Sequence, residues 1–168
     1  MKHTNKNHKR RNNKKRQTKK CNGGGDLDID NIDTWKIDAE EIFNELTQEQ
    51  GNNKYLTLAK YDDANDKVRD KVKKAVLPHF TEVAGVGMKV DLYEFTAAYY
   101  FTMAQKFHDG TSALIQDDYL KLKKLLPDLP NFDDVKTLNK GMDGKSVIYF
   151  TEFFPLYKKK YPPPQPTA

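Results

Sequence analysis

Two stretches decide the fold, DGTSALIQDDY at residues 109–119 and DGKSVIYFTEF at residues 143–153. Both begin with Asp-Gly, carry a Ser two residues after the Gly, and end with a carboxylate followed by an aromatic ring. Each position in the first stretch lies 34 residues before its counterpart in the second, as Asp109 lies before Asp143 (109 to 143). Because repeats define the units from which a fold is built, this spacing predicts a repeated architecture.

A second pair of stretches upstream has the same offset. GNNKYLTLAKY at residues 51–61 aligns with GVGMKVDLYEF at residues 85–95. The corresponding positions are Gly51 and Gly85, Leu56 and Val90, Leu58 and Leu92, and Tyr61 and Phe95. The two pairs are related to each other by a longer offset, that from Tyr61 to Tyr119. The sequence therefore predicts four units arranged as two pairs.

Each unit combines an apolar helical stretch, a Gly-containing turn, a β-branched or Leu position, a carboxylate and an aromatic residue. From about residue 39 to 160 this pattern resembles the EF-hand family, in particular four-unit members such as sarcoplasmic calcium-binding proteins and calexcitin. The segment KVDLYEF carries the resemblance best, because Val90, Glu94 and Phe95 fit positions eight, twelve and thirteen of the calcium loop. The resemblance implies an all-α fold of two pairs of EF-hand-like helix-loop-helix units, with short antiparallel strands between the loops of each pair.

The tetratricopeptide repeat is an alternative with the same period within each pair. Its Trp-x-x-Leu-Gly start is missing from this sequence. The longer offset between the pairs also interrupts a regular stack of units. These two departures favour the EF-hand-like interpretation.

Composition divides the chain into five parts. We expect a disordered basic tail at 1–25, an acidic linker at 26–37, a first EF-hand-like pair at 38–104, a second at 105–160, and a Pro-rich tail at 161–168. The linker places acids at alternate positions, as the first half of a calcium loop does, but Ile37 occupies the closing position. A strand-like linker is therefore predicted there. The Pro-rich tail is polyproline-like and suits either a stiff solvated end or a ligand of an SH3 or WW groove.

The charge of the chain is unevenly distributed. Ten of its 29 basic side chains lie within positions 1–20, which contain no acid, whereas all 24 acidic side chains lie beyond them. Such a run binds phosphates or other acidic partners non-specifically, with strong salt dependence, or remains a solvated leader. The candidate binding residues are Lys9, Arg10, Arg11, Lys14, Lys15, Arg16, Lys19 and Lys20.

Apolar spacing also predicts the individual helices. They are expected at about 39–46, 57–76, 92–104, 117–126, 132–138 and 151–157, the last interrupted by Pro155. The helix at 92–104 serves both the second and the third unit, which explains the shorter spacing there. Residues 147–150 are β-prone and are expected to pair with residues 113–115.

The ligand set of a calcium loop is incomplete in all four units. Lys60 occupies the closing position of the first loop, and the second has Asp91 and Glu94 without oxygens at its first positions. The third and fourth loops are two residues longer than usual between Gly and the closing acid. The candidate metal residues are Asn139, Asp143 and Glu152 in the fourth loop, Asp91 and Glu94 in the second, and Asp109 and Asp118 in the third. Calcium is thus the one cofactor considered, with an expected Kd on the order of millimolar or weaker.

No catalytic constellation, P-loop or zinc-ligand spacing is present, so we do not expect an enzyme. No apolar run long enough to span a membrane and no secretory signal is found either, and an intracellular protein of the cytoplasm or nucleus is expected.

The sequence favours a protein-interaction or scaffold module with an EF-hand-like body, weak or lost calcium binding and a basic tail for acidic partners. The candidate residues of a partner groove are Phe101, Met103, Phe107, Phe153 and Phe154, each of which also suits a core position. The alternatives are a calcium sensor or buffer that uses the fourth loop, and a small RNA- or ribonucleoprotein-associated protein that acts through its tail. The partner itself and the oligomeric state are not encoded in any recognisable motif.

Overall fold

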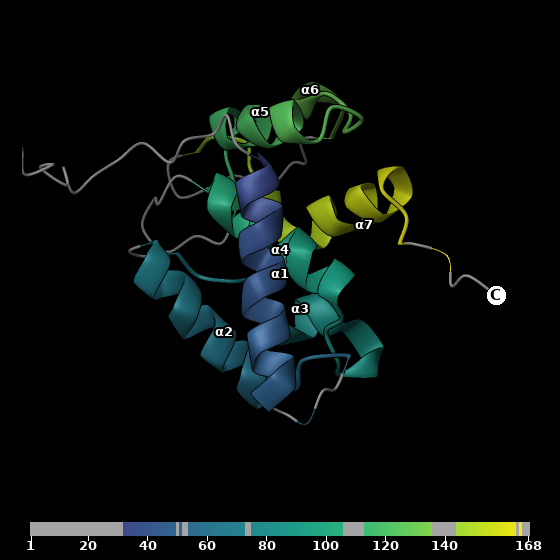
Figure 1. Cartoon of the computed structure of the whole chain (residues 1–168). Helices are drawn as coiled ribbons and strands as arrows, with labels where there is room; N and C mark the ends of the chain where they lie inside the picture. The colour runs from purple at the N-terminus through teal and green to yellow at the C-terminus, as the bar shows by residue number, and fades with distance from the viewer. Residues whose placement is uncertain are drawn as a thin grey trace, which may run out of the picture.

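A computed structural model describes residues 32–49, 51, 54–72, 75–105, 113–135, 144–163 and 165. Within them the fold is mostly helical, with one short antiparallel pair of strands (Figure 1). The elements are α1 (Ile32–Glu49), α2 (Leu58–Lys71), α3 (Phe80–Ala84), the 3₁₀ turn η1 (Gly85–Gly87), α4 (Leu92–Ala104), β1 (Ala113–Leu114), α5 (Gln116–Leu125), α6 (Phe132–Val135), β2 (Ile148–Tyr149) and α7 (Phe150–Lys160). The predicted helical class is therefore confirmed, whereas the basic tail at residues 1–25 lies outside the described residues.

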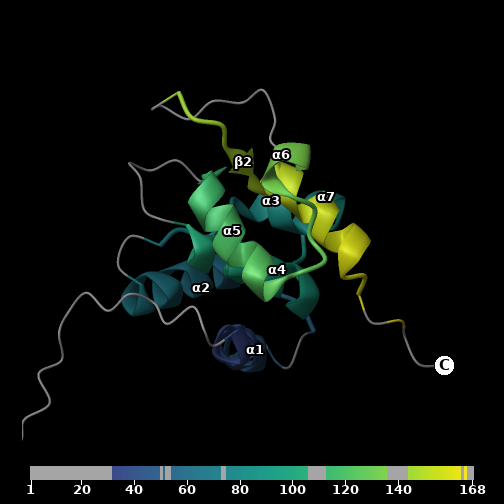
Figure 2. The ribbon, with the colours of Figure 1, turned by 90° about the horizontal axis from the view of Figure 1, so that it is seen from above.

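Helix α4 lies at the centre of the molecule. It packs against α1, α3, α5 and α7, and in Figure 2 it lies between α1 on one side and α5 on the other. Apolar side chains surround α4 on most sides, which is why Phe95, Phe101 and Tyr99 are almost fully buried. The sequence predicted this helix with its observed bounds, between the second and third loops.

Each predicted pair of loops is joined by a backbone pairing. In the first pair, Leu56 and Val90 exchange N–H···O bonds of 2.7 and 3.1 Å across an isolated antiparallel bridge. In the second pair, β1 and β2 run antiparallel with Leu114 opposite Ile148. All four side chains are completely buried. The predicted strand pairing is thus confirmed, and the step from the first pairing to the second (56 to 114, 90 to 148) equals the offset from Tyr61 to Tyr119.

A second set of contacts also occurs once in each half. The hydroxyl of Tyr61 donates to the carbonyl of Pro78 at 2.8 Å, and its ring meets Phe80 edge-on at 5.5 Å. Tyr119, the counterpart of Tyr61 in the second half, makes the same two contacts with the carbonyl of Pro130 at 3.0 Å and the ring of Phe132 at 5.7 Å. Since Phe80 begins α3 and Phe132 begins α6, each tyrosine positions the incoming helix of the following unit.

The prediction of a linker through residue 37 is wrong, because α1 already begins at Ile32. Trp35 and Ala39 are buried in the core and continue the apolar stripe of Ile42 and Leu46 towards the N-terminus. That stripe, spaced at three to four residues, determines the conformation more strongly than the alternation of acids does. The remaining linker positions, residues 26–31, lie outside the described part of the chain.

The helix predicted at 57–76 is shorter in the structure, where α2 ends at Lys71. Residues 75–77 lie outside any helix or strand, and Ala75 and Leu77 are buried while Val76 between them is exposed. The side-chain oxygen of Asn65 accepts the N–H of Leu77 at 2.9 Å and holds this segment against α2. The apolar side predicted for this helix therefore does not extend to Val76, which is exposed.

Helix α7 continues through Pro155 to Lys160, so the predicted interruption is also wrong. A proline inside a helix loses one backbone hydrogen bond and costs about 3 kcal/mol. Phe150, Phe153 and Tyr157 on the same helix are buried, while Pro155 itself is exposed. Burial of three aromatic side chains, at about 1.5–3 kcal/mol each, outweighs that cost.

The helix predicted at 132–138 is seen in part. Helix α6 covers Phe132–Val135, and the last three predicted residues lie outside the described chain.

No helix in the described ranges is both long and apolar enough to cross a bilayer.

Candidate functional site

The closing positions of the four predicted loops share one place in the structure, the third residue of an α-helix. The helices α2, α4, α5 and α7 have Thr57, Asp91, Ile115 and Tyr149 as their N-cap residues. Three residues later the chain places Lys60, Glu94, Asp118 and Glu152. The candidate site of this fold is therefore the set of helix N-termini beside the two loop pairings.

In the second unit the closing acid takes part in a reciprocal helix cap. Glu94 Oε2 accepts the backbone N–H of Asp91 at 3.1 Å, and Asp91 Oδ1 accepts the backbone N–H of Glu94 at 2.8 Å. This capping box satisfies two backbone donors that the helix itself cannot satisfy. Burial raises the pKa of the Glu94 carboxyl, an effect opposed by its hydrogen bond to the Asp91 amide. The two predicted ligands of this loop thus bind each other's backbone.

In the fourth unit Glu152 makes the equivalent contact. Its Oε2 accepts the backbone N–H of Tyr149 at 2.9 Å, at the point where β2 passes into α7. The other predicted ligands of this loop, Asn139 and Asp143, lie outside the described residues. The structure therefore shows one member of the fourth-loop set, in a capping role.

The closing positions of the first and third loops have different surroundings. The Lys60 ammonium lies 2.5 Å from Glu49 Oε2 and 3.1 Å from Asp63 Oδ2, and these hydrogen bonds raise its pKa. Asp118 is completely buried at the start of α5, with the Lys121 ammonium 4.0 Å from its Oδ1. The helix N-terminus and this cation attract a carboxylate at Asp118, whereas its complete burial opposes the negative charge. Asp109, the other ligand predicted for the third loop, lies outside the described chain.

These residues do not fit a calcium site in the first pair of units. Calcium requires six to eight oxygens, and a cation already occupies the closing position of the first loop. The second loop offers only the two carboxylates that form its capping box. Across the described ranges, no group of three or more His, Cys, Asp or Glu side chains lies close enough to hold a metal.

The candidate groove residues belong to the core. Phe101 and Phe153 are completely buried with ring centroids 5.5 Å apart, and Met103 and Phe154 are each about 6% exposed. Phe101 also meets Phe150 edge-on at 5.3 Å. The ring contacts of Phe101 thus join α4 to α7 in the core. Phe107 and the basic residues predicted in the tail, from Lys9 to Lys20, lie outside the described chain.

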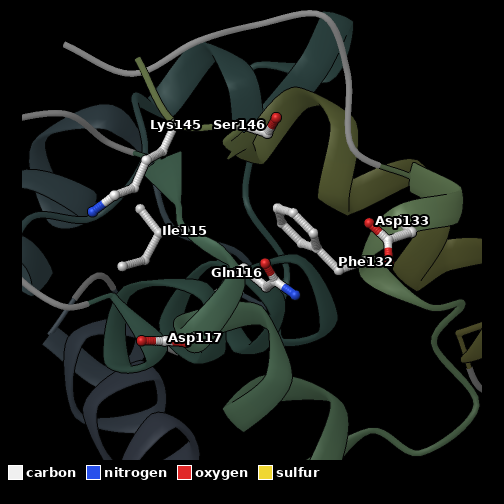
Figure 3. A pocket seen from close by; sticks show the side chains of 7 residues that line it. All are labelled: Ile115, Gln116, Asp117, Phe132, Asp133, Lys145 and Ser146. Carbon is white, nitrogen blue, oxygen red and sulfur yellow. The ribbon is translucent and has the colours of Figure 1, made fainter. Parts of the chain in front are cut away.

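An open cleft of about 360 Å³ lies beside the second loop pairing. Figure 3 shows Lys145 and Asp133 on opposite sides of it, with Gln116 between them. Its lining comes from the start of α5, the start of α6 and the segment before β2, and consists of Ile115, Gln116, Asp117, Phe132, Asp133, Lys145 and Ser146. The lining carries polar groups of both charges, which suit weak polar contacts with a ligand.

Sequence reasoning missed a cluster of tyrosines at the end of α7. The Tyr93 hydroxyl donates to the backbone carbonyl of Tyr161 at 2.5 Å, and the backbone N–H of Asp128 donates to the Tyr161 hydroxyl at 3.0 Å. The ring of Tyr157 stacks on the ring of Tyr161 at 5.5 Å and meets the ring of Tyr93 in a tilted contact at 5.3 Å. The spacing of Tyr157 and Tyr161, four residues or about one helical turn, was the sequence signal that could have indicated this cluster.

No protein-family model matches the chain, and searches of the curated proteins and of the solved structures find no significant match.

Proposed function

We propose that this chain is a non-enzymatic, EF-hand-like module for protein interaction or scaffolding, whose helical body works without calcium. In this proposal the basic residues 1–20 add attraction to acidic partners.

The observation that carries the proposal is the use of Glu94 as a helix cap. The carboxylate of Glu94 accepts the backbone N–H of Asp91, and the carboxylate of Asp91 accepts the backbone N–H of Glu94. A bidentate calcium ligand directs two oxygens into the loop, and each capping bond that must be broken to do so costs about 0.5–2 kcal/mol. Capping and calcium binding therefore compete for this carboxylate. In the second loop both hydrogen bonds of the cap are formed, whereas the set of calcium ligands is incomplete.

The packing of the body supports the same conclusion. The pairings Leu56–Val90 and Leu114–Ile148 join the loops through backbone hydrogen bonds and buried aliphatic side chains. Helix α4 then links the two halves through ring contacts such as Phe43–Phe95 at 5.9 Å and Phe101–Phe150 at 5.3 Å. Apolar burial at about 25 cal/mol per Å² supplies a driving force that does not depend on a cation.

The charge pattern supports a module that meets acidic partners through its tail. Residues 1–20 carry ten basic side chains and no acid. The body is acidic in places, since α1 exposes Glu41, Glu45 and Glu49. Lys and Arg runs gain binding free energy by displacing counterions from polyanions, so partner binding through the tail should weaken as salt rises.

Affinity capture from native extract tests the proposal. The full chain and a chain lacking residues 1–20 are each immobilised, and partners are compared with calcium or a chelator at low and high salt. We expect the same protein partners with calcium and with chelator, because the body does not require the ion. Deletion of residues 1–20 should remove only the salt-sensitive, acidic partners.

Two other outcomes would support the alternatives. Partners captured only with calcium would contradict the proposal and identify a calcium sensor that uses the fourth loop. Loss of every partner on deletion of residues 1–20, or on treatment with ribonuclease, would identify a ribonucleoprotein component whose tail is its main functional part.

A further inference from the structure

The end of helix α7 presents an exposed basic turn followed at once by prolines. Lys158, Lys159 and Lys160 are all exposed, and the Lys158 ammonium lies 4.1 Å from the centroid of the Phe154 ring. The segment YPPPQP follows at residues 161–166. The described members of this segment beyond Tyr161, namely Pro162, Pro163 and Gln165, are exposed.

Tyr161 fixes the point from which this segment leaves the body. Its carbonyl accepts the hydroxyl of Tyr93 on α4, and its own hydroxyl accepts the N–H of Asp128 in the turn after α5. Its ring stacks on Tyr157 at 5.5 Å with an interplanar angle of 28°. In both Figure 1 and Figure 2 the yellow trace that directly follows α7 leads away from the helices. Pro162 and Pro163 therefore follow an anchored residue and are presented to solvent.

The residue types of the segment favour the polyproline II helix. A proline ring restricts its own φ to the range of this helix, and a residue before proline avoids the α-helical region, so consecutive prolines extend. Polyproline II has about three residues per turn, which places residues three apart on one edge. Pro163 and Pro166 are three apart and form the one P-x-x-P spacing in the segment, with Lys160 three residues before Pro163.

We propose that residues 160–166 are the ligand of a polyproline-binding groove of the SH3 kind, lined by aromatic rings and bordered by carboxylates. The edge formed by Pro163 and Pro166 fills the aromatic groove. The exposed cations at the end of α7 meet the acidic border, which gives the complex its orientation. Because a preformed polyproline helix loses little conformational entropy on docking, a short segment is sufficient. This assignment rests on the proposed function and names the class of protein that the module binds.

Titration of the full chain against a panel of purified SH3 domains with acidic groove borders tests the assignment. We expect saturable binding to at least one domain, and a loss of at least about tenfold in affinity for Pro163→Ala/Pro166→Ala. The matched control is Pro164→Ala, which lies off the P-x-x-P edge and should change affinity by less than about twofold. Lys160→Glu should weaken binding most at low salt, where charge attraction is least screened.

Thermal melting of each variant checks that the body is unchanged. Absence of saturable binding by the unaltered chain to every domain would overturn the assignment, as would equal losses for Pro164→Ala and Pro163→Ala/Pro166→Ala. If the body keeps its calcium-independent partners in the doubly substituted chain while no SH3 domain binds, the tail assignment alone fails and the proposed function stands.

Discussion

The hydroxyl of Tyr119 donates a hydrogen bond of 3.0 Å to the carbonyl of Pro130, repeating the 2.8 Å bond of Tyr61 to Pro78. Each tyrosine also packs edge-on against the phenylalanine two residues beyond that proline. Since the two tyrosines occupy equivalent positions in the two halves, the repetition seen in the sequence extends to individual contacts.

Tyr61→Phe and Tyr119→Phe should each lower the free energy of unfolding by about 0.5–1.5 kcal/mol, because each removes one hydroxyl and keeps the ring. Urea denaturation of the full chain measures the change. A loss confined to only one of the two substitutions would show that the halves do not use the motif equivalently.

Glu94→Ala and Glu152→Ala should each cost about 0.5–2 kcal/mol of stability, because each removes a carboxylate that accepts an N-cap amide. The cost should be the same with calcium and with chelator. Glu41→Ala, an exposed position in α1, is the matched control and should change stability by less than about 0.5 kcal/mol. A destabilisation by either variant that appears only when calcium is present would identify that residue as a ligand.

Leu114→Ala should cost about 2–5 kcal/mol, because Leu114 is completely buried where the strands β1 and β2 pair. Leu120→Ala removes the same atoms from a side chain on α5 that is 45% exposed, so its effect should be much smaller. Denaturant unfolding of the two variants gives the comparison. Similar losses for both would mean that the strand pairing is not part of the core.

Lys60→Glu restores an acid at the closing position of the first loop, yet it should destabilise the protein. The substitution replaces attraction to Glu49 and Asp63 by repulsion, so the free energy of unfolding should fall. High salt should reduce the difference from the unaltered chain. Lys60→Met, which removes the attraction without adding repulsion, should lie between the two. Recovery of the Lys60→Glu variant by micromolar calcium would mean that the first loop keeps a usable ligand set.

The protein should lose stability in alkali through its buried phenols. Burial, followed by the charge of Asp134, raises the pKa of Tyr119 to about 12, whereas the unfolded chain titrates near 10. Between these values the unfolded state releases a proton that the folded state retains, so the free energy of unfolding is constant below about pH 10 and falls above it. Urea midpoints, measured together with tyrosinate absorbance, test this. A midpoint that stays constant to about pH 12 would contradict the assigned burial.

The elements that could be predicted were those with a strong local or repeated signal. Helix α4 has apolar residues on most of its faces, and the loop pairing at Leu114 and Ile148 follows from the repeat offset within the second pair. The start of α1 was missed because the alternation of acids concealed the apolar stripe that begins at Trp35. Pro155 was interpreted as a break because local propensity ignores the aromatic burial that keeps α7 continuous.

The sequence predicts which residues close the loops, but it does not predict the hydrogen bonds that Glu94 and Glu152 make. Glu94 and Glu152 stand at the expected closing positions, yet their oxygens accept N-cap amides, a contact that spacing alone does not distinguish from metal ligation. Phe101 and Phe153 were candidates for a groove, and only the three-dimensional packing shows that each is enclosed by the other's helix. Tyr93 and Tyr161 are far apart in the sequence, so their contact depends on the placement of α4 beside α7.

Calorimetric titration of the chelator-treated full chain with calcium, followed by circular dichroism, tests the central claim most directly. If apolar burial and helix caps hold the four units together, helical ellipticity is complete in chelator and no saturable heat appears below about millimolar calcium. Micromolar binding accompanied by a large gain of helix would show that the ion organises the fold, and would contradict the account.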